Sequence, residues 1–184
     1  KVQDILQEKE NGGFDAVFVA IGAHLAKKVN IPAQEASKIL DAVSFLKEAD
    51  ENSDNKPLLG RRVAIYGGGN TAMDAARTAK RLGADEAMII YRRDREHMPA
   101  HEFEADEALS EGVKIHWLSS IKNMETSSIT VEKMQVVDGK AVPTGEYETL
   151  EADSLILALG QEADTDFLKH IEGITFKEDG TTVE

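Results

Sequence analysis

Three consecutive glycines at residues 67–69 stand between a short apolar run and a long alanine-rich segment. The run before them, residues 62–66 (RVAIY), has the length and β-branched content of a buried strand. The segment after them, residues 70–82, carries alanines close to helical spacing and ends at Gly83, as helices commonly do. A second apolar run follows at residues 87–91 (AMIIY). This order of strand, turn, helix and strand, over about 30 residues, predicts a βαβ unit with parallel strands.

The glycines have the spacing of a turn that binds a dinucleotide, G-x-G-x-x-A. Gly67 is at the position of the tight turn, Gly69 where the backbone comes closest to a pyrophosphate, and Ala72 where the helix packs on its strand. The positive end of the helix points at the phosphates. Asn70 and Thr71 add side-chain hydrogen bonds, or Asn70 caps the helix. A tight turn without a ligand is the alternative. The predicted pyrophosphate site is Gly67, Gly68, Gly69, Asn70 and Thr71.

The end of the second strand indicates which dinucleotide binds. An NAD site places Asp or Glu there to bond the ribose hydroxyls. This chain instead has Tyr91 followed by Arg92, Arg93, Asp94 and Arg95. A guanidinium pairs with a 2′-phosphate through two hydrogen bonds, whereas a carboxylate repels it. Arg92, with Arg93 or Arg95, therefore favours NADP(H). The alternative is an NAD site beside arginines in a solvated loop, which the nearby carboxylates would fit.

Patterns outside the βαβ unit predict further elements. Before it we expect the end of an amphipathic helix over 1–12, a buried strand over 14–21 (FDAVFVAI), a helix over 34–49 and a polar loop over 50–57. After it we expect a polar helix over 101–111, a strand over 113–118, an antiparallel meander over 120–150, a buried strand over 154–159 and a hairpin near 178–180. The predicted fold class is α/β: a Rossmann-like three-layer dinucleotide-binding domain with a parallel sheet and an antiparallel β-meander.

Composition narrows the possible functions. The chain has 184 residues, a net charge of −13 and no cysteine. Without cysteine it has no disulfide, no thiol nucleophile and no ligands for an iron–sulfur cluster of its own. The negative charge disfavours nucleic acid and anionic membranes as partners. No apolar run approaches the roughly 20 residues of a membrane span and no signal peptide opens the chain, so we expect a cytoplasmic protein.

Residues for other chemistry are few. Of the five histidines, only His97 and His101 have i, i+4 spacing, and Pro99 lies between them, so no metal site is expected. No serine stands in G-x-S-x-G, the turn of many hydrolases. Hydride transfer needs no acid–base pair, and we assign no catalytic residue.

Basic residues concentrate in one stretch of this acidic chain. Such a cluster suggests either a specific small anion or a solvated surface of salt bridges. The cluster consists of Arg61, Arg62, Arg77, Lys80, Arg81, Arg92, Arg93 and Arg95.

The stretch from Gly60 to Leu118 resembles the NADPH domain of the glutamate synthase small (beta) subunit family, which are NADPH-dependent flavoprotein oxidoreductases. Two strands that bracket this stretch, ending in Ala20-Ile21-Gly22 and Ala158-Leu159-Gly160, are similar to the crossings between the FAD and NADPH domains of that family. The motifs that carry the resemblance are Gly67-Gly68-Gly69-Asn70-Thr71-Ala72-Met73-Asp74, Ala76-Arg77-Thr78-Ala79, Arg81-Leu82-Gly83-Ala84, Tyr91-Arg92-Arg93, Met98-Pro99-Ala100 and Glu111-Gly112-Val113.

The resemblance implies a function. NADPH would bind here and pass a hydride to FAD, and electrons would then leave through iron–sulfur clusters to a partner, in glutamate synthase the large subunit. It implies a pyrophosphate site at Gly67, Gly69, Asn70 and Thr71, a 2′-phosphate site at Arg92 and Arg93, and a nicotinamide end near Ala158, Leu159 and Gly160.

The resemblance also implies domain boundaries. Residues 1–57 would be a flank from the FAD domain with a crossing segment, 58–160 the NAD(P)H-binding domain, and 161–184 the start of the return to the FAD domain. Because the family's FAD glycine motif and cluster cysteines have no counterpart here, FAD and clusters are expected only in the full-length protein, and the fragment alone is expected to be inactive. Two alternatives are the same domain in a ferredoxin- or sulfide-linked NADP oxidoreductase, and a non-catalytic nucleotide-binding module.

Overall fold

The computed structural model describes residues 4, 7–8, 11–23, 25–27, 29–33, 38–50 and 56–177. The chain divides into two compact units, residues 26–160 and residues 1–25 together with 161–184. Most buried apolar side chains belong to the larger unit, which therefore carries the hydrophobic core. In the described part of the chain, no helix has the length and apolar character needed to cross a membrane.

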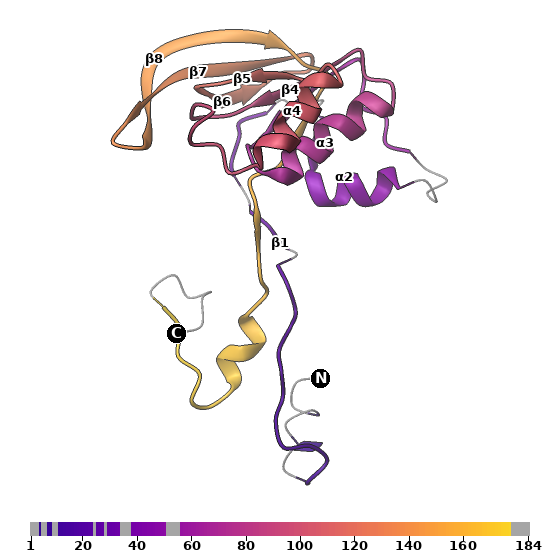
Figure 1. Cartoon of the computed structure of the whole chain (residues 1–184), viewed down its shortest axis with the longest axis vertical. Coiled ribbons are helices and arrows are strands. Elements are labelled where there is room, and N and C mark those ends of the chain that lie inside the picture. The colour runs from indigo at the N-terminus through magenta and orange to yellow at the C-terminus, as the bar shows by residue number, and fades with distance from the viewer. Residues whose placement is uncertain are drawn as a thin grey trace. The chain divides into compact units, whose positions relative to one another are not determined.

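A five-stranded parallel sheet runs through the larger unit (Figure 1). Every pair of neighbouring strands is parallel. In spatial order the strands are β2 (Lys38–Asp41), β9 (Ser154–Leu157), β3 (Arg62–Tyr66), β4 (Glu86–Ile90) and β5 (Lys114–His116). The strand of this sheet that comes last in the sequence, β9, lies beside β3, the first strand of the βαβ unit, so the carboxyl ends of both meet at one edge of the sheet.

Three helices and a second sheet complete the larger unit. The helices are α2 (Ala42–Ala49), α3 (Asn70–Arg81) and α4 (Glu102–Ser110). The second sheet is antiparallel, with the order β6 (Ser119–Met124), β7 (Ser128–Val137) and β8 (Lys140–Glu151). These elements confirm the predicted α/β class, the βαβ unit, the helix that follows it and the antiparallel meander.

Side-chain alternation along the parallel strands divides the core between two faces. On β3, Val63 and Ile65 pack with the helices, whereas Ala64 packs with the antiparallel sheet. Alanines fill the buried side of α3, so this helix lies close to its sheet. Figure 1 shows the same three layers, with helices and antiparallel sheet on opposite sides of the parallel strands.

The predicted helix over 34–49 is corrected by the structure. Residues 38–41 form the strand β2, and the helix begins only at Ala42; residues 34–37 lie outside the described part. Asp41 marks the boundary, because its carboxylate accepts a hydrogen bond from the Ser44 backbone N–H at 2.8 Å and caps the helix. The apolar residues before it pair with β9, a partner far away in the sequence.

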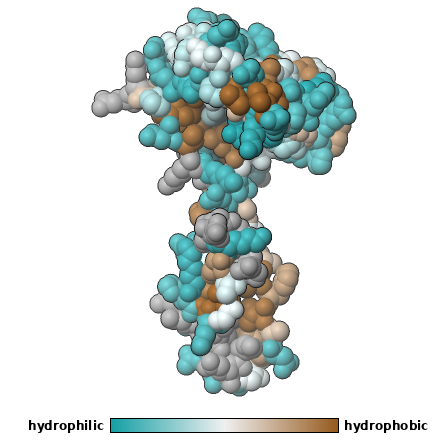
Figure 2. All heavy atoms as spheres, turned by 90° about the vertical axis from the view of Figure 1, so that its left-hand side faces the viewer, coloured by the Kyte–Doolittle hydropathy of each residue, from teal (hydrophilic) through white to brown (hydrophobic). Residues whose placement is uncertain are grey.

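The predicted buried strand over 14–21 is wrong. These residues belong to no strand, and Phe18 is 92% exposed. Brown, apolar side chains are visible at the surface of this smaller unit in Figure 2. An apolar run signals a preference for burial, but a strand also needs a hydrogen-bonded neighbour, and no described segment pairs with this one.

The remaining described elements are short. A 3₁₀ helix, η1, spans Asp166–His170. A two-stranded sheet pairs β1 (Leu25–Ala26) with β10 (Gln161–Glu162). The helix predicted over 1–12 falls largely, and the hairpin predicted near 178–180 entirely, outside the described residues. The assignment of both flanks to an FAD domain stays a prediction, although β2 and α2, from the expected flank 1–57, belong to the larger unit.

Candidate functional site

A cavity of about 530 Å³ opens where β3, β4 and β9 end. Open parallel sheets bind ligands at this edge, outside the carboxyl ends of their strands. Among the eleven residues predicted for the site, the structure brings nine to the cavity: Gly67, Gly68, Gly69, Thr71, Arg92, Arg93, Ala158, Leu159 and Gly160. Asn70 and Arg95 lie elsewhere.

The first two glycines of the turn are required by packing. Gly67 has a φ of +152°, and a Cβ on it would come within 2.2 Å of the Ala158 carbonyl oxygen. A Cβ on Gly68 would come within 2.4 Å of the Tyr91 ring. Both glycines therefore let neighbouring strands and loops close tightly around the turn. The Gly67 N–H donates to the Ile90 carbonyl at 3.1 Å, which ties the turn to β4.

The third glycine borders open space. A Cβ on Gly69 would meet nothing within 4 Å, and Gly69 is the N-cap of α3. The backbone N–H groups of Gly69, Asn70 and Thr71 donate to no acceptor among the described residues. A helix N-terminus with unused donors beside open space is suited to a phosphate group, because the donors and the helix dipole both favour negative charge.

Asn70 makes a contact that the sequence did not predict. Its side chain does not cap α3. Its Oδ1 atom instead accepts a hydrogen bond from the His101 backbone N–H at 3.0 Å. The neighbouring Ala100 N–H donates to the Gly68 carbonyl, also at 3.0 Å. These two bonds hold the start of α4 against the glycine turn.

Carboxylate pairing separates the arginines into two groups. Five of them form salt bridges, which was one of the two alternatives for the basic cluster. Arg77, for example, contacts Glu107 at 2.8 Å and Glu111 at 2.6 Å. The other paired arginines are Arg61 with Asp85, Arg62 with Glu151 and Asp153, Arg81 with Glu111, and Arg95 with Asp106 and Glu102.

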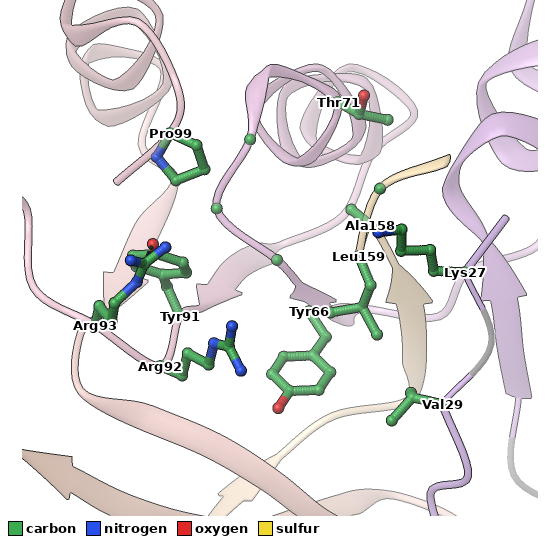
Figure 3. A pocket seen from close by; sticks show the side chains of 14 residues that line it. Lys27, Val29, Tyr66, Thr71, Tyr91, Arg92, Arg93, Pro99, Ala158 and Leu159 are labelled. Atoms are coloured by element: carbon green, nitrogen blue, oxygen red, sulfur yellow. Dashed lines mark hydrogen bonds between the residues drawn. The ribbon is translucent and has the colours of Figure 1, made fainter. Parts of the chain in front are cut away.

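Arg92 and Arg93 form the second group, and both line the cavity. Neither pairs with a carboxylate among the described residues. Figure 3 shows Arg92 projecting into the cavity between Tyr91 and Tyr66, and Arg93 lying beside Tyr91. The described residues that line the cavity include no Asp or Glu, so the charge they supply is positive in an otherwise acidic chain.

Arg95 points away from this cavity. Its guanidinium lies 2.6 Å from the Asp106 carboxylate of α4, and that pairing raises the Arg95 pKa. The residue pattern alone left open whether Arg93 or Arg95 accompanies Arg92, because pairing with α4 depends on the folded geometry.

Asp94, the carboxylate of this loop, is also occupied locally. Its Oδ1 lies 2.6 Å from His97 Nδ1 and accepts the His97 backbone N–H at 3.1 Å. The hydrogen bond with the His97 side chain is the main cause that lowers the Asp94 pKa. Asp94 thus closes a turn within the loop instead of lining the cavity.

Sequence reasoning missed five residues of the cavity wall: Lys27, Val29, Tyr66, Tyr91 and Pro99. Tyr66 is the last residue of β3 and Tyr91 directly follows β4, and these positions alone could have flagged them. Lys27 and Val29 carry no comparable signal, because their segment reaches the cavity through the Lys27 N–H, which donates to the Gly160 carbonyl at 3.1 Å.

The sheet edge, the glycine turn and the helix N-terminus together define the larger unit as a dinucleotide-binding domain of the Rossmann type. Comparison with known families shows which family of proteins this domain belongs to. The family model "Pyridine nucleotide-disulphide oxidoreductase" matches residues 1–183, and the chain belongs to that family.

Individual relatives agree with this assignment. The chain is 36% identical over 181 residues to the NADP(+)-dependent formate dehydrogenase subunit beta of Moorella thermoacetica, covering 90% of this chain and 25% of that protein. It is 33% identical over 178 residues to a putative glutamate synthase [NADPH] small chain of Cereibacter sphaeroides, covering 87% and 43%. The second match confirms the resemblance stated from the sequence. This chain thus spans 25% of the length of the first relative and 43% of the length of the second.

A solved structure supports the fold. FprA of Mycobacterium tuberculosis, in complex with NADPH, superposes with a TM-score of 0.69 over 97% of this chain and 55% of that one. At 20% identity, this likeness concerns the architecture alone.

Proposed function

We propose that this chain is the NADPH-binding domain of a glutamate synthase small-subunit-like oxidoreductase. One observation carries the cofactor assignment: Arg92 and Arg93, which have no carboxylate partner in the described part of the chain, both line the cavity at the end of β4. A dinucleotide with a 2′-phosphate supplies the anion that this position requires. The relatives named above, which are described as NADP(+)- or NADPH-dependent, support the same choice.

The parts of the cavity then have distinct roles. The N–H groups of residues 69–71 bind the pyrophosphate, and Arg92 and Arg93 bind the 2′-phosphate. Ala158 and Leu159 lie across the glycine turn from Arg93 (Figure 3), and with Gly160 they face the nicotinamide end. NADPH bound there supplies a hydride for FAD. Because the 184 residues hold no cysteine, the iron–sulfur clusters that pass electrons to a partner belong to other parts of the full-length protein, which we expect in the cytoplasm.

Replacing Arg92 tests the cofactor assignment. In the intact protein, Arg92→Ala is expected to weaken NADPH binding by about 1.5–3 kcal/mol, roughly 10- to 150-fold, because a charge-assisted pair is lost. NADH, which lacks the 2′-phosphate, should lose far less affinity. Equilibrium titration with both nucleotides measures the two losses.

The matched control is Arg95→Ala. Arg95 lies in the same loop but pairs with Asp106 outside the cavity, so this variant should leave the ratio of NADPH to NADH affinities unchanged. Equal losses for the two nucleotides in Arg92→Ala would refute the 2′-phosphate assignment.

A second candidate concerns the electron acceptor. The likeness to a formate dehydrogenase subunit favours the same NADP(H) domain in an oxidoreductase with a partner other than the glutamate synthase large subunit, such as a ferredoxin- or sulfide-linked enzyme. Co-purification of the intact protein with its partner subunits distinguishes these cases. A non-catalytic nucleotide-binding module is eliminated if the intact protein reduces a dye with NADPH.

A further inference from the structure

Tyr91, the last residue before the two unpaired arginines, is at the centre of a hydrogen-bond network. Its hydroxyl lies 2.6 Å from the His97 carbonyl oxygen and 3.1 Å from the Nε atom of Arg93. A carbonyl only accepts and a guanidinium only donates, so the direction of both bonds is fixed. The hydroxyl gives its one proton to His97 and accepts from Arg93.

This arrangement determines which edge of the Arg93 guanidinium is presented to the cavity. Because Nε–H is bound to Tyr91, the two terminal Nη groups are left to bind a ligand. The Arg93 guanidinium carbon also lies 5.9 Å from the centroid of the Tyr91 ring, within range of a cation–π contact. An arginine held this way offers two parallel donors, which is the geometry that suits a phosphate.

Tyr91 itself is held firmly. Only 6% of its surface is exposed. The ring rests on Gly68 and meets Trp117 edge-to-face, with centroids 6.3 Å apart and an interplanar angle of 80°. Its backbone N–H donates to His116 and its carbonyl accepts from Ser119, at 3.0 and 2.9 Å. The hydroxyl therefore projects from a rigid support, not from a side chain that must itself be ordered when a ligand binds.

Arg92 provides the contrast. It follows Tyr91 directly and lines the same cavity, yet its exposed guanidinium makes no hydrogen bond or ion pair with any described residue. Ordering Arg92 on a ligand costs side-chain entropy that the Tyr91 contact has already removed from Arg93. The two arginines thus differ in how far they are preorganised.

We propose that Tyr91 is a positioning residue for recognition of the 2′-phosphate, acting through Arg93. It orients the Arg93 fork toward the cavity, and it anchors the loop over 92–97 through the His97 carbonyl. This inference rests on the proposed function, since it concerns the same NADP(H) site, and it adds a specificity-determining residue that makes its contribution through another side chain.

Tyr91→Phe tests the proposal, because phenylalanine keeps the ring on Gly68 and against Trp117 and removes only the hydroxyl. In the intact protein, the ratio of NADPH to NADH affinities is expected to fall by about 3- to 10-fold, the range of one ordinary hydrogen bond, because Arg93 loses the contact that orients it. If Tyr91 had a merely structural role, its replacement would weaken the binding of both nucleotides equally and leave the ratio unchanged. Tyr147→Phe is the control, since its exposed hydroxyl interacts with Glu132 on the antiparallel sheet, away from the cavity.

A double-mutant cycle assigns the effect to Arg93. In an Arg93→Ala background, Tyr91→Phe should not lower the ratio further, whereas in an Arg92→Ala background it should lower it again. Arg93→Lys gives a second test that leaves Tyr91 intact: it keeps the charge but lacks the fork, and the ratio should again fall. An unchanged ratio in Tyr91→Phe, or additive losses of Tyr91→Phe and Arg93→Ala, overturns the proposal.

The outcomes also separate this inference from the proposed function. If Arg92→Ala and Arg93→Ala both leave the NADPH preference intact, the NADP(H) site itself is wrong. If they lower the preference but Tyr91→Phe does not, the site stands and only the positioning role of Tyr91 fails.

Discussion

Each glycine of the turn at residues 67–69 meets a different environment. Gly67 is opposed by the Ala158 carbonyl and Gly68 by the Tyr91 ring, whereas Gly69 faces open space. Three identical residues thus serve two purposes. The first two are needed to build the turn, and the third leaves room for a ligand.

Alanine substitutions should separate these purposes. Gly68→Ala places a Cβ 2.4 Å from the Tyr91 ring, and such overpacking is expected to lower the free energy of unfolding by about 1–3 kcal/mol. Gly69 has a φ of −92°, and a Cβ there would meet no other atom. Gly69→Ala should therefore change the free energy of unfolding by less than about 1 kcal/mol. The added Cβ is nevertheless expected to weaken NADPH binding, because it occupies space that the pyrophosphate needs. Chemical denaturation and NADPH titration of both variants check this; equal stability losses would contradict it.

At the residue scale, the sequence predicted which residues of a motif lie at the cavity. It did not predict the hydrogen-bond and ion-pair partners of these residues. The spacing of the glycines and the placement of Arg92 and Arg93 after β4 identified the cavity, because strand ends and helix starts follow from local pattern. The role of Asn70 in binding the His101 N–H and the pairing of Arg95 with Asp106 did not follow, because both partners come from a loop and a helix whose approach is set by packing.

Elements were predicted well where their partners are close in sequence. The β3–α3–β4 unit brings two strands together through a single helix, and its boundaries agree with the pattern to within a residue or so. The pattern over 38–41 predicts a helix where the structure has the strand β2, because the pairing of this strand with β9 spans more than a hundred residues. The run over 14–21 predicts a buried strand that the structure lacks, because composition says nothing about whether a neighbouring strand is present.

One carboxylate links two strands that are distant in sequence, β3 and β9. Asp153 accepts the backbone N–H groups of Arg61 and Arg62 at 2.9 and 2.8 Å and the Arg62 guanidinium at 3.1 Å. Burial acts to raise the Asp153 pKa, but the hydrogen bonds from Arg62 and Arg61 outweigh it, so the pKa is lowered. Asp153 therefore secures the start of the strand pair that forms the cavity edge.

Removing this carboxylate should destabilise the fold in a pH-dependent way. Asp153→Ala leaves two backbone donors without their acceptor and is expected to cost about 1–3 kcal/mol at neutral pH. Because the folded pKa lies below the unfolded value of about 3.9, this contribution is present above about pH 4 and is lost as the pH falls through the folded pKa. Denaturation of both proteins from pH 7 to pH 3 should show their stabilities converging.

The control for Asp153→Ala is Asp166→Ala. Asp166 pairs with Lys169 at an exposed position, where an ion pair contributes little. A stability difference between wild type and Asp153→Ala that stays constant down to pH 3 would exclude the proposed linkage.

At the scale of the whole chain, the core belongs to one unit. Both clusters of buried apolar residues lie within residues 26–160. The described residues that line the cavity lie within the same range. The flanks contribute no described residue to either cluster or to the cavity wall.

A protein limited to residues 26–160 is therefore expected to fold by itself and to bind NADPH with an affinity close to that of the 184-residue chain. Cooperative thermal unfolding followed by circular dichroism, together with NADPH titration, checks both points. Loss of cooperative unfolding would mean that the flanks contribute to the core after all.

The division of the arginines bears on how cofactor preference could change during evolution. Five arginines are committed to ion pairs that join elements of the fold, and replacing them disturbs those contacts. Arg92 and Arg93 have no such commitment to a carboxylate among the described residues, so they can vary with little structural penalty. On the proposed function, a lineage could exchange one nicotinamide cofactor for the other by changing these two codons, without needing compensating mutations elsewhere.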